Sequence, residues 1–298
     1  MITTVLDTLT GQLGKRFLLN AFFPVLLFSL LAAAVVTPGG DDLSASVAAY
    51  EEQSAAAKVL IVVGWASVVF VAANLLANAS VSIIRLFEGY ALPQWIEEHG
   101  RSYWYKKAAA AMDKKDPARD LKYPLPAPGM KFSYKDVAPT RLGNVLRSTE
   151  TYPEARYGAP ALRVWPRLYH LLPQELRTSF EEAQSAMEFL LVVAFLSGLF
   201  GPPATVYLVC VEAPTGWVLA ASTGSSIVAY AAYVGALAPA GLYADSIRAA
   251  FDAHRMRVLE ALQVPRPATV AEERRTWEHV ISRLDRGVGQ PGRYVPAP

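Results

Sequence analysis

Four long stretches of the chain contain no charged residue, and they restrict the possible folds more than any other feature of the sequence. They are Phe17–Gly40, Val59–Ile84, Phe189–Val211 and Ala213–Ala244. A helix needs about 20 apolar residues to cross the hydrocarbon core of a bilayer, and buried helices of soluble proteins are seldom this long and uncharged. Hydrophobic residues make up 53% of the chain and charged residues only 18%. The sequence therefore predicts an all-α integral membrane protein with four transmembrane helices.

The charges between these stretches predict the orientation in the membrane. Lys15 and Arg16 precede the first stretch, and basic residues outnumber acidic ones in residues 85–186 and in the tail, residues 244–298. The other two connections are acidic. Because basic residues near helix ends stay on the cytoplasmic side, we expect a multi-pass protein of the inner (plasma) membrane with both termini in the cytoplasm. The alternative is that the first stretch is a cleaved signal peptide, but its apolar core is longer than is usual for one.

This pattern divides the chain into four parts: an N-terminal arm with spans one and two (1–84), a cytoplasmic insert (85–186), spans three and four (187–243) and a cytoplasmic tail (244–298). The insert and the tail are expected to be helical, with prolines between the helices. The expected helices are Leu86–Glu98, which continues span two past Pro93, and those near Thr140–Thr149, Ala161–Leu172, Gln174–Met187 and Val270–Leu284.

Polar side chains recur at helical spacing in two of the predicted spans. Asn74 and Asn78 lie in the second span, and Ser222, Ser226 and Tyr230 lie in the fourth. Polar groups are costly in hydrocarbon, so both stripes should face other helices or water. They are candidates for lining a pore, and the alternative is that they form hydrogen bonds between helices.

The third span is interrupted by Gly201-Pro202-Pro203, three residues after Gly198. Prolines remove helix donors and clash with the preceding turn. The span is therefore expected either to kink or to divide into a helix and a re-entrant segment. Gly198, Gly201, Pro202 and Pro203 are candidates for a hinge or gate.

The insert contains a run of arginines that includes Arg141, Arg147 and Arg156. Such a run suits a phosphate-bearing ligand or anionic lipid headgroups. The alternative is a solvated surface on which the arginines pair with nearby acidic residues.

Motifs for the common enzyme chemistries are absent from the sequence. It has no phosphate-binding glycine loop, no dinucleotide fingerprint and no paired-histidine zinc motif, its four histidines are scattered, and Cys210 is its single cysteine. No strongly basic region or known module points to nucleic acid. We therefore expect a protein that is not an enzyme and uses no cofactor, metal or nucleic acid.

Parts of the sequence resemble uncharacterised four-span bacterial membrane proteins. The similar segments are Arg141–Arg147, Tyr157-Gly158, Trp165–Leu168 and Leu18–Phe28 with its internal Pro24. The resemblance implies four spans over most of the chain and implies no activity. A large insert after span two also resembles the layout of bestrophin-type anion channels, but none of that family's motifs is present, so the similarity is one of layout only.

Together these features favour a homo-oligomeric channel or pore-like assembly in the lipid bilayer, gated by its cytoplasmic part. Span two or span four would line the pathway. The alternative is a membrane-anchored scaffold or adaptor whose cytoplasmic surface recruits a cytosolic protein partner. In that case the polar stripes would serve only to hold helices together.

Overall fold

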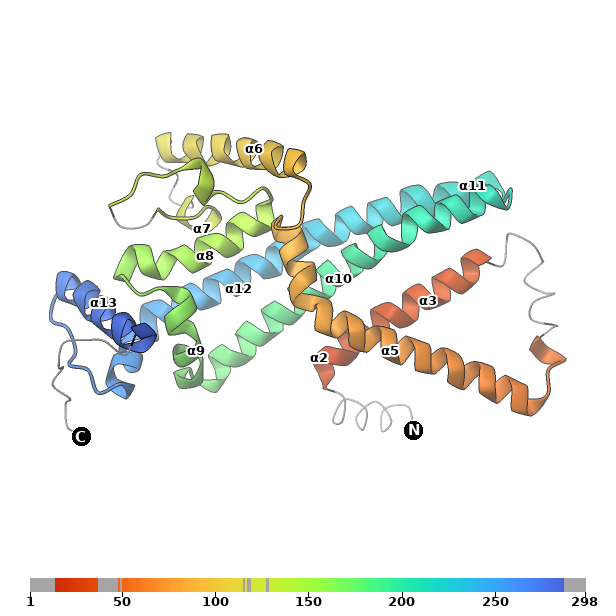
Figure 1. Cartoon of the computed structure of the whole chain (residues 1–298), viewed down its shortest axis with the longest axis horizontal. Helices are drawn as coiled ribbons and strands as arrows, with labels where there is room; N and C mark the ends of the chain where they lie inside the picture. The colour runs from red at the N-terminus through yellow and green to blue at the C-terminus, as the bar shows by residue number, and fades with distance from the viewer. Residues whose placement is uncertain are drawn as a thin grey trace. The chain divides into compact units, whose positions relative to one another are not determined.

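The computed structural model describes residues 14–36, 48, 50–114, 116, 119–126 and 129–286, and over these residues it is helical with no β-strand (Figure 1). This confirms the all-α prediction. Most of the predicted N-terminal arm and the end of the tail lie outside the described residues. The helices are α2 (Lys15–Phe17), α3 (Phe23–Val36), α5 (Ala55–Glu88), α6 (Gln94–Asp113), α7 (Arg119–Lys122), α8 (Arg141–Tyr157), α9 (Ala161–Leu171), α10 (Gln174–Cys210), α11 (Thr215–Leu219), α12 (Ser225–Ala261) and α13 (Val270–Arg286), with π-helical turns η1 (Leu18–Phe22) and η4 (Ala220–Gly224) and the 3-10 turn η3 (Tyr134–Asp136).

Four helical stretches are long and apolar enough to cross a membrane: Lys15–Val36, Ala55–Glu88, Gln174–Cys210 and Thr215–Ala261. Each overlaps one of the four charge-free stretches of the sequence. The first combines α2, η1 and α3, and the last combines α11, η4 and α12. The number and order of the candidate spans are therefore those that the sequence predicts.

The chain forms two compact units. Unit 1 comprises residues 1–84 and 185–236, and unit 2 comprises residues 85–184 and 237–298. The boundaries fall inside α5, α10 and α12, so each of these helices contributes residues to both units.

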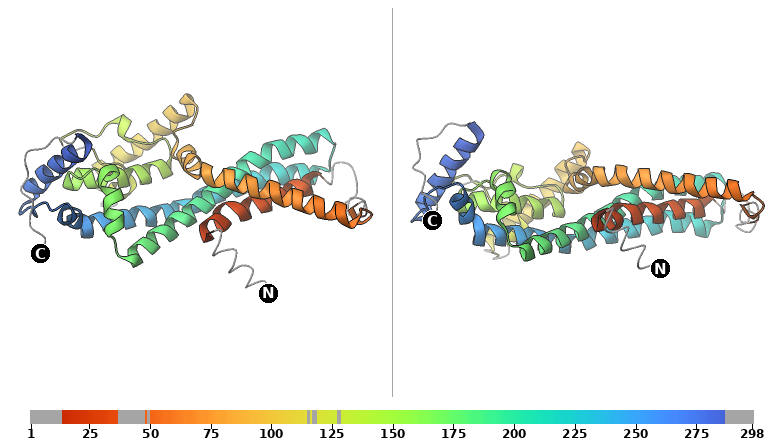
Figure 2. Two further views of the ribbon diagram at one scale, coloured as in Figure 1. Left: turned by 60° about the horizontal axis from the view of Figure 1, so that its bottom comes forward. Right: turned by 90° about the horizontal axis from the view of Figure 1, so that it is seen from below.

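In unit 1, α10 lies beside the helix formed by α11, η4 and α12, as the views in Figure 1 and Figure 2 agree. Leu208 and Ala204 of α10 pack on Ala221 of η4 in a small buried cluster. The ring of Phe28 in α3 contacts that of Phe200 in α10 edge-on, with 5.9 Å between the ring centres. Small residues at these contacts allow the helices to approach closely, as is usual where membrane helices pack.

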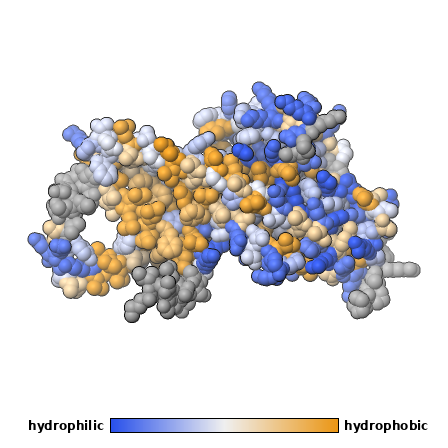
Figure 3. All heavy atoms as spheres, turned by 180° about the vertical axis from the view of Figure 1, so that it is seen from behind, coloured by the Kyte–Doolittle hydropathy of each residue, from blue (hydrophilic) through white to orange (hydrophobic). Residues whose placement is uncertain are grey.

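The surface of unit 1 is unusually apolar for a protein in water. Large side chains of α5 are widely exposed, and Leu60 is 72% exposed and Leu75 68% exposed. On the face drawn in Figure 3, hydrophobic side chains cover most of unit 1, and hydrophilic side chains dominate on unit 2. Exposed apolar surfaces of this extent are typical of regions that contact a membrane or another protein, which agrees with the four candidate spans.

Unit 2 has a conventional hydrophobic core. Trp277 of α13, Phe251 of α12 and Leu168 of α9 are fully buried in one cluster. The helix α8 lies along α12, to which it is joined by side-chain hydrogen bonds described below (Figure 2). Unit 2 therefore folds around its own core of side chains from the insert and the tail.

Two helix boundaries differ from those expected. The prediction that span two continues past Pro93 is wrong, because α5 ends at Glu88 and Gly89 adopts a φ of 102°, which favours glycine. Pro93 instead precedes the first residue of α6, where its missing N–H costs nothing. The helix expected near Thr140–Thr149 extends to Tyr157, with Thr140 as its N-cap.

Candidate functional site

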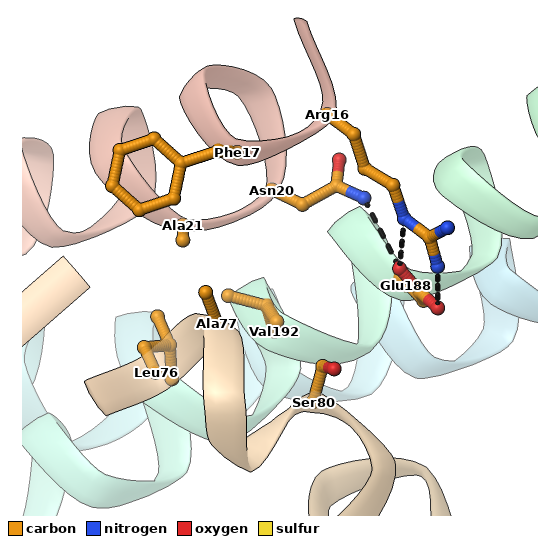
Figure 4. A pocket seen from close by; sticks show the side chains of 9 residues that line it. All are labelled: Arg16, Phe17, Asn20, Ala21, Leu76, Ala77, Ser80, Glu188 and Val192. Atoms are coloured by element: carbon orange, nitrogen blue, oxygen red, sulfur yellow. Dashed lines mark hydrogen bonds and ion pairs between the residues drawn. The ribbon is translucent and has the colours of Figure 1, made fainter. Parts of the chain in front are cut away.

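A cavity of about 290 Å³ lies in unit 1 between η1, α5 and α10. Its wall combines apolar side chains with a few polar and charged ones (Figure 4). The lining residues are Arg16, Phe17, Asn20, Ala21, Leu76, Ala77, Ser80, Glu188 and Val192. A concave, mostly apolar site with a few convergent polar groups is the usual form of a small-ligand site.

An ion pair between Arg16 and Glu188 forms the charged side of this cavity. The Nε of Arg16 donates to Oε2 of Glu188 over 3.0 Å, and its Nη2 donates to Oε1. The side chain of Glu188 is only 6% exposed, whereas that of Arg16 is 50% exposed. A buried carboxylate needs such a partner, because desolvation of an unpaired charge costs several kcal/mol.

Asn20 and Ser185 extend this pair into a polar cluster. Asn20 Nδ2 donates to Glu188 Oε2 over 3.4 Å and to Ser185 Oγ over 3.1 Å. Arg16 and Asn20 are four residues apart, and Ser185 and Glu188 three apart, so each pair shares one helix face. Figure 4 shows Arg16 and Asn20 directed at Glu188.

Asn20 lies in the π-helical turn η1, which ends two residues before Pro24. Pro24 has no N–H to donate to the carbonyl of Asn20 four residues earlier. The turn widens, and the N–H of Phe23 bonds to the carbonyl of Leu18, five residues back. Widened turns of this kind occur frequently at functional sites. The internal Pro24 thus accounts for the widened helical turn that contains Asn20, beside the cavity.

Sequence reasoning missed this cluster, although a signal was present. Arg16 and Glu188 each precede a charge-free stretch by one residue, so they appeared only as the limits of spans one and three. The two residues are 172 positions apart. Their pairing depends on tertiary packing, which spacing along one helix does not reveal.

The predicted stripe on α5 lies on the outside of unit 1. Asn78 is exposed and Asn74 half-buried. Each side-chain amide donates to a backbone carbonyl one turn earlier, Asn78 to Asn74 and Asn74 to Phe70, both over 2.8 Å. These asparagines do not face the cavity.

The predicted stripe on η4 and α12 is arranged in the same way. Ser226 is exposed, Tyr230 is 71% exposed, and Ser222 is half-buried. Ser226 donates to the carbonyl of Ser222 over 2.7 Å, and Ser222 to that of Val218 over 2.9 Å. Among the described residues, no hydrogen bond joins this stripe to the one on α5.

The glycines and prolines of the third span lie within one helix, because α10 continues from Gln174 to Cys210. Pro202 and Pro203 are exposed. Gly201 is buried against η4 and α12, and a Cβ at this position would lie 2.0 Å from Ser225 Oγ and 2.8 Å from Ser225 Cβ. Gly198 has no such neighbour within 4 Å. The segment is a point of close helix contact and is not divided into two helices.

Gly201→Ala is therefore expected to lower the thermal stability of the purified protein, by about 1–3 kcal/mol for an overpacked site. Gly198→Ala, three residues earlier, should be neutral or slightly stabilising, because alanine favours a helix over glycine. Thermal unfolding in detergent, followed by circular dichroism, measures both. Adding Ser225→Gly to Gly201→Ala should restore stability, and equal stability of the two single variants would contradict the close contact.

The three arginine candidates lie on α8 of unit 2 and are not brought together. Arg141 and Arg156 are exposed and Arg147 is half-buried. Arg147 and Arg156 are nine residues apart, about two and a half helical turns, and therefore lie on opposite faces. The guanidinium of Arg156 instead lies 5.4 Å from the ring centre of Tyr152.

A second polar cluster joins α8, α12 and α13 in unit 2. Tyr152 and Tyr157 donate to Asp252 over 3.0 and 2.6 Å, and Arg255 lies 3.7 Å from the ring centre of Tyr157 and bonds to Glu273 over 2.7 Å. Burial raises the pKa of both tyrosines, and the carboxylate of Asp252 raises it further. Both phenols thus remain protonated donors that hold the insert and α13 on α12.

The described residues contain no group of three His, Cys, Asp or Glu side chains placed to hold a metal ion. No protein-family model, curated protein or solved structure matches this chain.

Proposed function

We propose that this chain is a multi-pass membrane protein of the inner (plasma) membrane that assembles with copies of itself into a channel or pore-like assembly. In this proposal both termini are cytoplasmic, and the insert and tail gate the pathway. Four helices with the length and composition of membrane spans support the location. The basic insert and tail support the orientation.

The observation that carries the proposal is the position of the polar stripes. Asn78 and Ser226 lie on the outer surface of a unit whose other exposed side chains are largely apolar. In contact with lipid, amide and hydroxyl groups on this surface would be only partly satisfied by their own helix backbone. A neighbouring copy or a water-filled pathway removes this cost.

The same arrangement favours several copies over one. The two stripes are not hydrogen-bonded to each other, and their side chains do not line the cavity inside unit 1. A polar pathway along them therefore requires surfaces from more than one chain. Closed symmetric assemblies are the common way in which identical chains supply such a surface.

Gating by the insert is supported by α12, because this helix contributes residues to both units. Ser226 and Tyr230 lie in the part of α12 that belongs to unit 1, and Asp252 lies in the part that belongs to unit 2. Arg248 of α12, nearly fully buried, donates to Ser148 over 2.7 Å and to the carbonyl of Leu121 over 3.0 Å. Movement of the insert would thus act directly on the helix that carries the fourth-span stripe.

The test is ion flux into liposomes that contain the purified protein. Asn78→Leu and Ser226→Leu should each lower the flux about tenfold, the factor that corresponds to a polar contact worth about 1.4 kcal/mol to a permeating ion. Asn78→Ser keeps a hydrogen-bonding group at the same position and should retain most of the flux. Light scattering in detergent should give a mass of several chains.

A monomer by light scattering would contradict the pore, because four spans in one chain leave little room for a shared pathway. Liposomes without flux would also contradict it. These results would instead favour a scaffold or adaptor that recruits a cytosolic partner through unit 2.

A further inference from the structure

We propose that the cavity beside Arg16 binds a phospholipid, with the phosphate on Arg16 and part of an acyl chain along the apolar wall. This inference does not depend on a pore, since it concerns the inside of unit 1 in a single chain. It requires that the candidate spans lie in a bilayer with Arg16 on the cytoplasmic side, as the proposed function has them. The cavity is then within reach of the lipid that surrounds the protein.

The wall of the cavity has the two-sided character that such a ligand needs. Phe17, Leu76 and Val192 provide apolar surface, and Arg16 with Asn20 provides hydrogen-bond donors at one side (Figure 4). A volume of about 290 Å³ is at the lower end for ligand cavities. It suits a headgroup and a segment of chain, with the remainder of the lipid outside.

The balance of donors and acceptors favours an anion over a cation. The carboxylate of Glu188 already accepts hydrogen bonds from Arg16 Nε, Arg16 Nη2 and Asn20 Nδ2. Arg16 is half exposed, and its Nη1 makes no hydrogen bond to any residue that the structure describes. Lys15, also exposed, adds a positive charge, so that Lys15, Arg16 and Glu188 together leave one positive charge in excess beside the cavity. A guanidinium with donors to spare binds a phosphate well, because two parallel N–H groups match two of its oxygens.

The position of the cavity along the helices places it at headgroup level. Ser80 and Ser185 lie within a few residues of the points at which the chain leaves unit 1 for unit 2. Arg16 begins the first candidate span, and Glu188 immediately precedes the apolar part of the third. Basic pockets between membrane helices at the cytoplasmic interface are where phospholipid headgroups bind.

The experiment measures binding of three compounds to the full-length protein in detergent. Phosphatidylglycerol has both phosphate and chains, diacylglycerol has chains without phosphate, and inorganic phosphate has no chains. Native mass spectrometry detects retained lipid, and thermal unfolding detects stabilisation by any of the three. We expect phosphatidylglycerol to be retained and to raise the melting temperature, with little effect of the other two.

Three variants test whether the lipid binds in the cavity. Arg16→Gln should weaken phosphatidylglycerol binding about tenfold through loss of a charge-assisted contact. Ala77→Leu fills the cavity and leaves the ion pair intact, so it should weaken binding to a similar extent in a folded protein. Arg85→Gln removes an exposed basic residue of α5 that does not line the cavity, and it should bind as the wild type does.

The proposal is overturned if Ala77→Leu retains phosphatidylglycerol as the wild type does, or if Arg85→Gln loses it equally. Equal retention of diacylglycerol would remove the role of Arg16 as the phosphate contact. Equal stabilisation by inorganic phosphate would assign the site to a free anion and not to a lipid. None of these results depends on ion flux or on the number of chains in the assembly.

Discussion

Replacing Arg16 by alanine is expected to destabilise the folded protein by about 3 kcal/mol, a typical loss when one partner of a buried ion pair is removed. The reason is the unequal burial of the pair, since Glu188 is 6% exposed and Arg16 50% exposed. Without Arg16, the carboxylate loses two charge-assisted hydrogen bonds and stays inside the protein. Thermal unfolding in detergent, followed by circular dichroism, measures the loss.

Replacing Glu188 should destabilise the protein less than replacing Arg16. In Glu188→Gln the buried group is neutral and can still accept from Arg16, and the guanidinium can turn toward water. The double variant Arg16→Ala with Glu188→Ala should be more stable than Arg16→Ala alone, because no buried charge is left behind. If Arg16→Ala melts at the same temperature as the wild type, the pair does not stabilise the contact between the first and third candidate spans.

Trp277→Ala should have an effect of similar or greater size in unit 2, about 3–5 kcal/mol for a fully buried tryptophan. Its side chain is 0% exposed and packs in the core with Phe251 and Leu168. The loss should free α13, and proteolysis in the connection at residues 262–269 should become faster. Both the melting temperature and the cleavage rate report the change.

Val270→Ala is the matched control on the same helix. Val270 begins α13 and is 66% exposed, so its truncation should change stability by less than about 0.5 kcal/mol. Equal cleavage rates for Trp277→Ala and Val270→Ala would mean that α13 is not held by its tryptophan.

The four candidate spans were predictable from the sequence because the signal is local. An uncharged run such as Val59–Ile84 strongly favours a helix in a bilayer, since a single segment can satisfy its own backbone hydrogen bonds there only as a helix. The tail helix near Val270–Leu284 was predictable for a related reason, because apolar residues such as Trp277 and Val280 recur at helical spacing and form its buried face.

The candidate site was only partly predictable. The spacing of Asn74 and Asn78 correctly placed them on one side of α5, but it did not reveal whether that side faces inward or outward. The pairing of Arg16 with Glu188 and the contact of Gly201 with Ser225 depend on which helices pack together. Gly201 was recognised as unusual from its two neighbouring prolines, whereas its packing required the position of α12.

The ion pair at Glu188 also marks one end of the charge-free part of the third candidate span. From Phe189 to Cys210 the chain has no charged side chain, and at ~1.5 Å per residue this part of α10 extends roughly 33 Å, close to the ~30 Å hydrocarbon core of a bilayer. Because Arg16 binds Glu188 at this end of α10, sliding α10 by one turn to suit a thinner or thicker membrane would break the ion pair. If the candidate spans lie in a bilayer as proposed, the adjustment would fall to tilt and to the surrounding lipid, and hydrophobic mismatch would favour membranes of one thickness.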